Sequence, residues 1–451
     1  MEIQLPQNVD YIINLLMKHG YEAYAVGGCV RDSILGKEPE DWDITTSAKP
    51  LEVKKIFVRT IDTGIQHGTV TIMLDKEGYE VTTYRIDGEY EDNRHPKEVE
   101  FTDNLVEDLK RRDFTINAMA YNKQKGLVDV FGGFNDIQQG LIRCVGSAVD
   151  RFDEDALRIL RAVRFSAQLG FLIDGDTLQA IQDKADNLKN ISAERIRVEL
   201  NKLLLSKNPD KLLKAFEMGI TKVVLPEFDA MMRTEQHNSH HIYTVGIHTM
   251  KAVERVGEAS EYNNKERLVL RWTMLLHDVE KPNCKVESQD GEEHFYGHPE
   301  KSAKIAKVIM RRLKFDNETI DMVVRLVKWH DYIFTLTPGG MRRATNKIGA
   351  DSMDFLFEVK RADILAQNPK TWEEKMNSLN IAKELFYDIQ SKLECVNLKM
   401  LEINGRDLLE LGFKSGKEMG ETLDQILEQV LENPLLNEKQ TLLDMAKQLL
   451  K

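Results

Sequence analysis

Two aspartates separated by one residue, a short distance behind a glycine pair, are the most chemically informative feature of this 451-residue sequence. Side chains at positions i and i+2 of a strand point to one face, so Asp41 and Asp43 can bind a divalent metal together. Gly27 and Gly28 lie between an apolar run and an amphipathic stretch, which predicts a strand, a tight turn and a helix. Such a turn presents backbone N–H groups to a polyphosphate. A phosphate site beside a metal site is what transfer of a nucleotidyl group needs.

Further motifs follow this segment, and together they resemble the class II tRNA nucleotidyltransferase and bacterial poly(A) polymerase family. They are Gly-Gly-Cys-Val-Arg-Asp at 27–32 with Asp-Trp-Asp at 41–43, Glu-Val-Thr-Thr-Tyr-Arg at 80–85, Arg-Arg-Asp-Phe-Thr-Ile-Asn-Ala-Met at 111–119, Asp-Val-Phe-Gly-Gly at 129–133, and Glu-Asp-Ala-Leu-Arg-Ile-Leu-Arg-Ala-Val-Arg-Phe at 154–165. The resemblance covers about the first 220 residues and, less tightly, the last 80. It implies an α/β nucleotidyltransferase head on a helical chain.

A third carboxylate usually completes the metal site of such a head. Glu80 qualifies because it lies on the second strand of a predicted hairpin, whose turn is expected at Asp75 to Gly78. We expect this strand beside the strand of Asp41 and Asp43. Asp113 is the alternative, and an exposed strand glutamate without a role is the plainer interpretation of Glu80. With Mg²⁺ bound by Asp41 and Asp43, the attacking hydroxyl is activated and the charge on pyrophosphate is neutralised.

Nucleotide choice points to the arginine-rich segment at 154–165. Cytosine and adenine both present an amino donor beside a ring-nitrogen acceptor, so one carboxylate paired with one arginine accepts both bases and rejects uracil and guanine. Asp155 and Arg158 have the i, i+3 spacing that places two side chains on one face of a predicted helix. The alternative is a solvated salt-bridge face. The family resemblance assigns base reading to this pair and a nucleotide contact to Arg112. Arg161 and Arg164 lie on the same predicted helix in a stripe adjoining Arg158, from which they can reach the triphosphate. The turn residues complete the predicted nucleotide site: Gly27, Gly28, Arg31 and Asp32.

The middle of the chain contains most of the histidines, in an order that resembles HD-type metal phosphohydrolases. His248, His277 with Asp278, and Asp363 are the candidate ligands, and imidazole with carboxylate suits a transition metal or magnesium. His298, or His330 with Asp331, could serve a second ion. Glu280 stands where glycine is common after this motif. A degenerate scaffold for RNA and an active phosphatase or phosphodiesterase therefore both stay open.

Hydrophobic periodicity divides the chain and sets its fold class. Short β-branched runs separated by turns occupy the first 145 residues, and apolar residues at i, i+3 and i+4 dominate afterwards. We expect an α+β protein with a small mixed sheet, followed by helices only. The predicted domains are a nucleotidyltransferase head at 1–145, a helical neck at 146–225, an HD-like domain at 226–370 and a helical body at 371–451.

Composition limits the partners. The net charge of −12 disfavours nucleic acid, but arginines cluster at 143–164 and 195–214, and a folded RNA needs only one basic strip. The four cysteines have no C-x-x-C spacing, which indicates reduced thiols in a cytoplasmic protein. No apolar run approaches the ~20 residues of a membrane span, and the N-terminus lacks a signal pattern.

Taken together, the resemblance implies an enzyme that adds C, C and A to the 3′ end of tRNA from CTP and ATP with Mg²⁺. The alternatives are a relative that adds only CC, only A or a poly(A) tail, an HD-type phosphohydrolase with its own divalent metal, and a non-catalytic RNA-binding module. A polar stretch at 87–97, expected to form a mobile loop near the metal ligands, favours an enzyme that can add the final A. The oligomeric state stays open.

Overall fold

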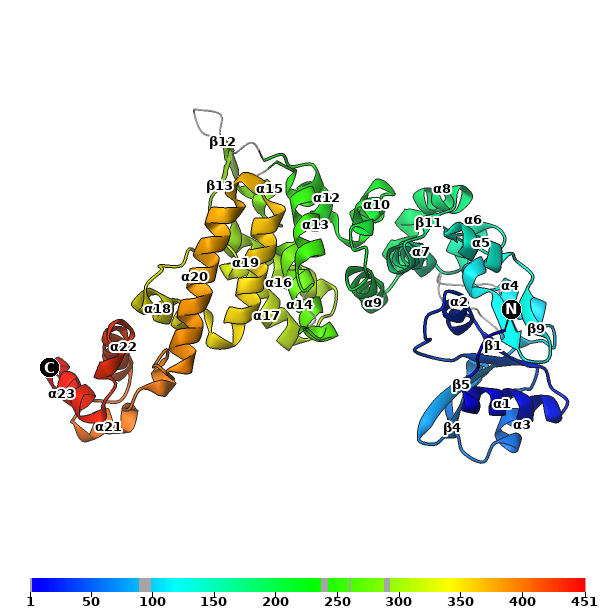
Figure 1. The fold of residues 1–451 in the computed structure, drawn as a ribbon, viewed down its shortest axis with the longest axis horizontal. Helices are drawn as coiled ribbons and strands as arrows, with labels where there is room; N and C mark the ends of the chain where they lie inside the picture. Colours follow the sequence, from blue (N-terminus) through cyan, green and yellow to red (C-terminus); the bar gives the residue numbers. More distant parts are fainter. Residues whose placement is uncertain (1, 89–98, 237–241, 259–260, 288–292, 451) are drawn as a thin grey trace. The chain divides into compact units, whose positions relative to one another are not determined.

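The computed structural model describes residues 2–88, 99–236, 242–258, 261–287 and 293–450. The chain forms two compact units, Met1–Pro226 and Glu227–Lys451. The first unit contains the sheet and a set of helices, and the second is helical apart from one short strand pair (Figure 1). This confirms the predicted α+β class with a small mixed sheet at the N-terminal end. The finer division into four domains stays a prediction.

Seven strands build the sheet of the first unit, in the order β3-β4-β5-β2-β1-β8-β9. Their bounds are β1 Ala23–Val26, β2 Ile44–Thr46, β3 Thr60–Gly64, β4 Thr69–Leu74, β5 Glu77–Thr83, β8 Met119–Asn122 and β9 Gly126–Asp129. Only β2 and β5 run parallel, and all other neighbours are antiparallel. Two helices, α1 (Gln7–Lys18) and α3 (Pro50–Ile56), pack against this sheet (Figure 1). Buried Tyr24, Val26, Tyr84, Leu109 and Ala120 form part of its core.

The hairpin β4–β5 is present as predicted, but its turn is shorter. Asp75 and Lys76 take positive φ values of 49° and 71°, so these two residues alone reverse the chain. Gly78, expected in the turn, lies inside β5 opposite Met73. A Cβ at Gly78 would be 2.9 Å from the Thr71 methyl carbon, which explains a glycine within a strand.

The rest of the first unit is mainly helical: α2 and α4 lie between strands of the sheet in sequence, and the other helices follow it. Its helices are α2 Gly28–Ile34, α4 Leu105–Lys110, α5 Gly133–Gln139, α6 Ala148–Glu154, α7 Leu157–Leu169, α8 Gly175–Lys184, α9 Ala193–Leu204, α10 Lys211–Glu217 and α11 Thr221–Val224. Two small pairs accompany them, β6 Arg85–Asp87 with β7 Val99–Phe101 and β10 Leu141–Ile142 with β11 Leu172–Ile173. Helices α7 and α9 pack against each other. Residues 89–97 of the predicted loop lie outside the described residues.

The second unit is a helical array. Its helices are α12 Pro226–Met232, α13 Val245–Arg255, α14 Asn264–Leu276, α15 Lys281–Cys284, α16 His298–Arg312, α17 Asn317–Trp329, α18 Pro338–Ile348, α19 Met353–Ala366, α20 Trp372–Ser391, α21 Gly405–Glu410, α22 Lys417–Glu432 and α23 Lys439–Leu449. The strand pair β12 Lys285–Glu287 and β13 Glu293–Phe295 interrupts it. Buried Arg342 of α18 donates to the Leu431 and Glu432 carbonyls at 2.6 and 2.9 Å, which satisfies the end of α22.

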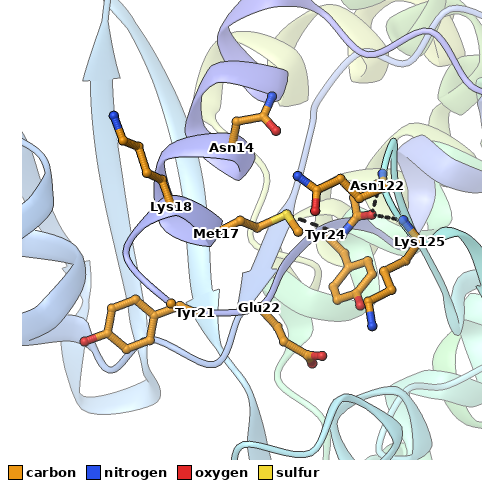
Figure 2. A pocket seen from close by; sticks show the side chains of 10 residues that line it. Asn14, Met17, Lys18, Tyr21, Glu22, Tyr24, Asn122 and Lys125 are labelled. Atoms are coloured by element: carbon orange, nitrogen blue, oxygen red, sulfur yellow. Dashed lines mark hydrogen bonds between the residues drawn. The ribbon is translucent and has the colours of Figure 1, made fainter.

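A cavity of about 340 Å³ lies beside the C-terminal end of α1, near the turn between β8 and β9 (Figure 2). Asn122 in its wall uses its side chain to fix that turn. Its carbonyl accepts from the backbone of Gln124 and Lys125 at 3.1 and 2.7 Å, and its amide donates to the Ala23 carbonyl at 2.9 Å. None of the predicted site residues lines this cavity, and we assign it no role.

Among the described residues, no helix combines the length and the apolar character that crossing a membrane requires. All four cysteines are buried and free.

The packing of α5 onto the 115–117 turn predicts a strongly position-dependent effect of adding a methyl group. In Gly133→Ala the new Cβ would lie 2.8 Å from the Thr115 carbonyl carbon, so backbone must move. We expect a loss of about 3 kcal/mol in the free energy of unfolding. Gly175→Ala, also at the start of a helix but with no atom within 4 Å of the new Cβ, should change it by less than about 0.5 kcal/mol. Urea unfolding compares the two, and equal effects would contradict the packing.

Candidate nucleotidyltransferase site

The glycine turn follows the predicted order of strand, turn and helix. Strand β1 ends at Val26, Gly27 takes φ +85°, and α2 begins at Gly28. A Cβ at Gly27 would be 2.9 Å from an Arg112 guanidinium nitrogen. Gly27 therefore serves twice, since it permits the backbone conformation and lets Arg112 approach the turn.

Asp41 and Asp43 lie immediately before β2 and not within a regular strand, which corrects the sequence prediction. Strand pairing nevertheless continues to Asp43, because its carbonyl accepts from Val26 N–H at 3.0 Å. Both aspartates are exposed. The protein around the Asp43 carboxyl group removes water from it and raises its pKa, the Asp41 charge adds to this rise, and Arg112 opposes it. Two exposed carboxylates this close in sequence are a donor set suited to a divalent cation that prefers oxygen ligands.

The parallel pairing of β2 with β5 places the two candidates for a third carboxylate differently. Ile44 pairs with Val81, and continuing this register by one residue places Glu80 beside Asp43. Glu80 is exposed, like the two aspartates. Asp113 is buried, and its carboxylate pairs with Arg161 at 2.6 Å. The geometry therefore favours Glu80 as the third ligand.

Arg31 and Asp32 are bonded to each other across two 2.9 Å contacts. Arg31 is buried and also donates to the side-chain Oδ1 atom of Asn117 at 2.6 Å. Asn117 thus fixes an arginine beside the glycine turn. In this arrangement Arg31 supports the turn, and Asp32 is its partner.

A cavity of about 240 Å³ lies where the segment after α4 meets the start of α7. It brings together Arg112, Asp155, Arg158 and Arg161, four of the residues predicted to bind nucleotide. Arg111 and Arg195 also line it, and sequence reasoning did not assign either of them a role. The signal for Arg195 was its place in the second arginine cluster, and Arg111 stands inside a matched motif.

Asp155 and Arg158 do not share a helix. The prediction that i, i+3 spacing on one helix brings them together is therefore wrong. Asp155 has an extended conformation between α6 and α7, and its carboxylate accepts from Leu157 N–H at 3.0 Å. The helix breaks here because Asp155 caps the new one. Its other oxygen pairs with Arg195 at 2.7 Å. Arg158 pairs with Glu154 and donates to the Arg111 carbonyl at 3.0 Å.

Arg161 and Arg164 separate in the structure. Arg161 lines the cavity, whereas Arg164 does not: it is buried and pairs with Glu199 of α9 at 2.8 Å. Burial lowers the pKa of Arg164, and Glu199 opposes this. Its guanidinium also lies 3.7 Å from the Phe165 ring centre. The predicted contact of Arg164 with triphosphate is not supported, because packing of α7 on α9 turns the side chain away.

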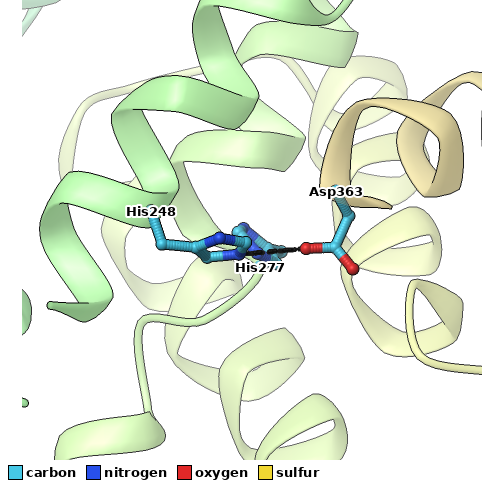
Figure 3. Close-up of side chains that lie close together, drawn as sticks. All are labelled: His248, His277 and Asp363. Carbon is cyan, nitrogen blue, oxygen red and sulfur yellow. Dashed lines mark hydrogen bonds and ion pairs between the residues drawn. The ribbon is translucent and has the colours of Figure 1, made fainter. Parts of the chain in front are cut away.

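The histidine-rich region brings its four predicted ligands together in the second unit. Figure 3 shows His248 and His277 facing Asp363. The His248 Nε2 atom lies 3.0 Å from Asp363 Oδ1, and His277 Nε2 lies 3.6 Å from it. Asp278 completes the group at 3.2 Å from His277 Nε2. Burial disfavours ionised Asp363, but its contacts with His248 and His277 outweigh this and lower its pKa.

Comparison with known proteins matches three segments of this chain to known families. Residues 23–143 match the family described as "Poly A polymerase head domain", 170–232 match "Probable RNA and SrmB- binding site of polymerase A", and 298–446 match "tRNA nucleotidyltransferase domain 2 putative". The CCA-adding enzyme of Ligilactobacillus salivarius is 34% identical over 97% of this chain and 95% of its own length. That of Pediococcus pentosaceus is 31% identical over 99% and 100%. The chain belongs to the family of CCA-adding enzymes. The family resemblance inferred from the sequence is thereby confirmed.

Coverage differs among these relatives. The CCA-adding enzyme of Lactiplantibacillus plantarum is 54% identical, but the match spans 46% of this chain and about half, 51%, of that protein. Among solved structures, the Bacillus stearothermophilus CCA-adding enzyme in complex with CTP is 30% identical, with a TM-score of 0.71 over 99% of this chain and 98% of that one. The Thermotoga maritima CCA-adding enzyme complexed with tRNA_CCA, 22% identical with a TM-score of 0.60 over the full length of both chains, shares the fold.

The buried Asp113 predicts how the first unit responds to acid. Burial favours the neutral carboxyl group, but Arg161 and Arg158 outweigh it and hold the pKa of Asp113 at about 2. A carboxylate whose pKa is lowered on folding stabilises the fold above its unfolded pKa and loses that effect as pH falls. We expect about 2 kcal/mol to be lost between pH 4 and pH 2 in the wild type. In Asp113→Asn that part of the slope should be missing, as measured by urea unfolding.

The exposed Asp186→Asn is the control for this prediction and should keep the wild-type pH dependence. An Asp113→Asn variant with an unchanged slope would show that the ion pair with Arg161 does not govern the acid response.

Proposed function

We propose that this chain adds C, C and A in turn to the 3′ end of tRNA, using CTP and ATP without a nucleic-acid template and releasing pyrophosphate. The observation that carries the proposal is the placement, in one compact unit, of an exposed carboxylate pair next to a glycine turn and a cavity lined by arginines and Asp155. The relatives and the solved CTP complex support the same activity. The four free cysteines accord with a cytoplasmic location.

The chemical step joins the terminal ribose hydroxyl oxygen to the α-phosphorus and breaks the bond from that phosphorus to the β-phosphate oxygen. Nucleotidyltransferases of this family use a divalent metal. Asp41 and Asp43, with Glu80 beside them, would hold Mg²⁺, which when bound lowers the pKa of the hydroxyl and neutralises charge on pyrophosphate. Their exposed oxygen donors fit this ion. The hydroxyl proton leaves with solvent.

Arginines orient the nucleotide in this proposal. Arg112 lies against Gly27, and Arg161 projects into the same cavity from α7, so both can contact the triphosphate. Asp155 and Arg158 read the base edge, with Asp155 accepting from the amino group and Arg158 donating to the ring. Both present their polar groups only after exchanging Arg195 and Glu154 for the base.

The first experiment measures addition to three primers: tRNA ending at the discriminator base, tRNA ending in CC, and oligo(A). Each is incubated with CTP, with ATP and with both, and products are resolved at single-nucleotide length. The proposal predicts CC from CTP, one A on the CC primer, and CCA from both. Addition that stops at CC, occurs only on the CC primer, or extends oligo(A) would identify one of the narrower relatives. No extension would leave an RNA-binding module.

Removing one metal ligand should abolish addition while the fold persists. In Asp41→Asn and Asp43→Asn we expect the rate of C addition to fall by about 10³-fold, because neutral amides hold a divalent cation poorly where charge develops. Asp62→Asn, an exposed aspartate of β3 paired with Lys54 at 2.8 Å, should leave the rate within a factor of about two. Single-turnover kinetics provide the measurement. Wild-type rates in both ligand variants would place the metal elsewhere.

Truncating Asp155 should loosen base selection. With no acceptor for the amino group, Asp155→Ala is expected to lower the preference for CTP over UTP, and for ATP over GTP, by roughly 10- to 100-fold in kcat/KM. The neighbouring exposed Asp153→Ala, which loses surface contacts to Lys184 and Asn187, is the control. Arg195→Ala separates the alternatives. If Asp155 acts only by holding Arg195, this variant will show the same loss; if Asp155 reads the base, Arg195→Ala will keep C/A selectivity.

A second candidate function is favoured by the convergence of His248, His277, Asp278 and Asp363. We infer that these side chains bind one divalent metal and that the second unit is an HD-type metal-dependent phosphohydrolase. Mixed imidazole and carboxylate donors suit a transition metal better than magnesium. If instead the unit is only a scaffold for RNA, no metal will stay bound to it. The metal content of the Asp41→Asn/Asp43→Asn chain, measured after chelator treatment, reloading with Mn²⁺ and gel filtration, distinguishes the two outcomes.

A further inference from the structure

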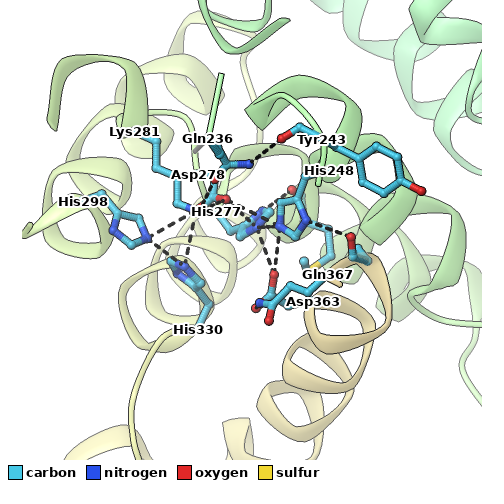
Figure 4. A network of polar contacts seen from close by, with 12 residues as sticks. Gln236, Tyr243, His248, His277, Asp278, Lys281, His298, His330, Asp363 and Gln367 are labelled. Atoms are coloured by element: carbon cyan, nitrogen blue, oxygen red, sulfur yellow. Dashed lines mark hydrogen bonds and ion pairs between the residues drawn. The ribbon is translucent and has the colours of Figure 1, made fainter. Parts of the chain in front are cut away.

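A buried carboxylate of α4, Asp108, connects the strand that follows the metal ligands with the arginines of the nucleotide cavity. The residue is 0% exposed and precedes Arg111 and Arg112 by three and four positions. A carboxylate in the protein interior needs cationic partners. Figure 4 shows such a case in the second unit, where Asp278 lies among histidines and pairs with Lys281 at 2.8 Å. Asp108 has its own set of partners in the first unit, and sequence reasoning gave it no role.

The two carboxylate oxygens of Asp108 have different partners. Oδ1 accepts from the Arg111 Nε and Nη2 atoms at 3.0 and 2.8 Å and from the Arg85 backbone N–H at 3.4 Å. Oδ2 accepts from the Thr45 hydroxyl at 3.2 Å and lies 3.8 Å from Arg112 Nη2. The short contacts to Arg111 and Thr45 therefore fix the carboxylate, and the charge on its second oxygen faces Arg112.

Thr45 ties Asp108 to the sheet. It is fully buried in the middle of β2, two residues after Asp43, and its hydroxyl also lies 3.2 Å from the Thr82 carbonyl of β5. Strand β2 pairs with β1 on one side and with β5 on the other, so Thr45 has a fixed position. The location of the Asp108 charge is thus set by the same strands that present Asp43 and Glu80.

Arg112 lies between two negative charges that have different effects on it. Burial lowers the pKa of its guanidinium, and Asp108 opposes this more strongly than Asp43 does. Within the described residues, Arg112 Nε is buried without a hydrogen-bond partner, so short contacts do not lock this side chain. A guanidinium drawn fully onto Asp43 would occupy oxygens that a divalent cation needs and would turn away from the cavity. The charge of Asp108 holds Arg112 back from Asp43.

We propose that Asp108 is a positioning residue that acts through Arg112 on the triphosphate of the incoming nucleotide. The inference rests on the proposed function and adds a buried group that touches neither nucleotide nor metal. Arg112 lines the cavity, and a cation already held in place binds a phosphate oxygen without first having to be ordered. Without the Asp108 charge, Arg112 is less ordered and is attracted to Asp43. Nucleotide affinity should therefore fall while the chemical groups of the site remain intact.

The test measures CTP affinity of the full chain. Asp108→Asn keeps the size of the side chain and removes its charge. Equilibrium dialysis with labelled CTP and Mg²⁺ is done without tRNA, so that no transfer to a primer takes place. We expect the dissociation constant to rise about 10-fold. With tRNA present, KM for CTP should rise by a similar factor while kcat stays within about three-fold of wild type.

Asp136→Asn is the matched control. Asp136 is 3% exposed, accepts from the Thr115 hydroxyl at 2.6 Å and pairs with Arg143 at 3.3 Å, but it is not among the residues that line the cavity. A merely structural effect of neutralising a buried carboxylate would appear in both variants. We expect the CTP dissociation constant and KM of Asp136→Asn to remain at wild-type values.

A double-mutant cycle tests whether Asp108 acts through Arg112. Arg112→Gln should raise the CTP dissociation constant, and adding Asp108→Asn to it should change the constant by less than about two-fold. If the effects of the two substitutions multiply instead, Asp108 does not act through Arg112 and the proposal is wrong.

Thr45 supplies a second pair of variants in case Asp108→Asn does not fold. Thr45→Val removes the hydroxyl that holds Oδ2 and should raise the CTP dissociation constant about three-fold, whereas Thr45→Ser should restore the wild-type value. An unchanged constant in Asp108→Asn, or in Thr45→Val if the first variant is unfolded, overturns the inference. A wild-type chain that binds CTP but extends no tRNA overturns the proposed function, and the dialysis data still decide the role of Asp108.

Discussion

The ion pair between Asp113 and Arg161 is the contact on which the first unit depends. Asp113 belongs to the segment that leads into the central strands, and Arg161 belongs to α7, so one buried carboxylate ties the sheet to the arginine helix. Asp113 also accepts from the Asn117 amide at 3.3 Å, and Asn117 in turn holds Arg31. The glycine turn and the cavity are thus fixed relative to each other through one charge network. Removal of a single partner would leave an unpaired buried charge, which is strongly destabilising.

Phe165 gives this network an apolar centre. The guanidinium groups of Arg31, Arg161 and Arg164 lie 5.1, 5.3 and 3.7 Å from its ring centre. Three cations can crowd around one ring because each has a carboxylate partner and because the ring face attracts positive charge. The acidic excess of the chain is consistent with this arrangement. Arginines near the cavity have acidic partners close by, as Arg158 has Glu154 and Arg195 has Asp155. A net charge of −12 therefore coexists with a locally basic surface.

The sequence predicted the family and the broad fold better than the local backbone around the candidate site. Motif order identified the family, and the mixed sheet, the glycine turn and the helical C-terminal half followed from local patterns. The break at Asp155 escaped prediction because Glu154 to Phe165 reads as one helix, and only the capping bond to Leu157 reveals two. Arg164 could not be separated from Arg161, since its burial depends on α9, which is distant in sequence. The short turn at Asp75 and Lys76 was hidden because a nearby Gly78 gave the stronger turn signal.

The histidines of the second unit also show that contacts between elements distant in sequence are hard to predict. Spacing picked out His248, His277, Asp278 and Asp363, because a known motif joins them. His298 was named as one candidate among others, and nothing along the chain shows that it meets His330 across two helices. Their convergence is a property of how α16 and α17 pack. A sequence reveals ligands that a known motif joins, whereas a meeting of residues outside the motif is visible only in the packing of separate elements.

The ion pairs in the arginine-lined cavity affect how fast a nucleotide would bind and leave. Because Asp155 and Arg158 already have partners, a base that binds as proposed would not meet bare polar groups; it would have to displace Arg195 and Glu154 from them. Net affinity is then the small difference between two sets of comparable contacts. A base with mismatched edges breaks these ion pairs and forms no equivalent hydrogen bonds in their place. Weak occupancy also lets the nucleotide leave quickly, so that one cavity can be vacated and reloaded between successive additions.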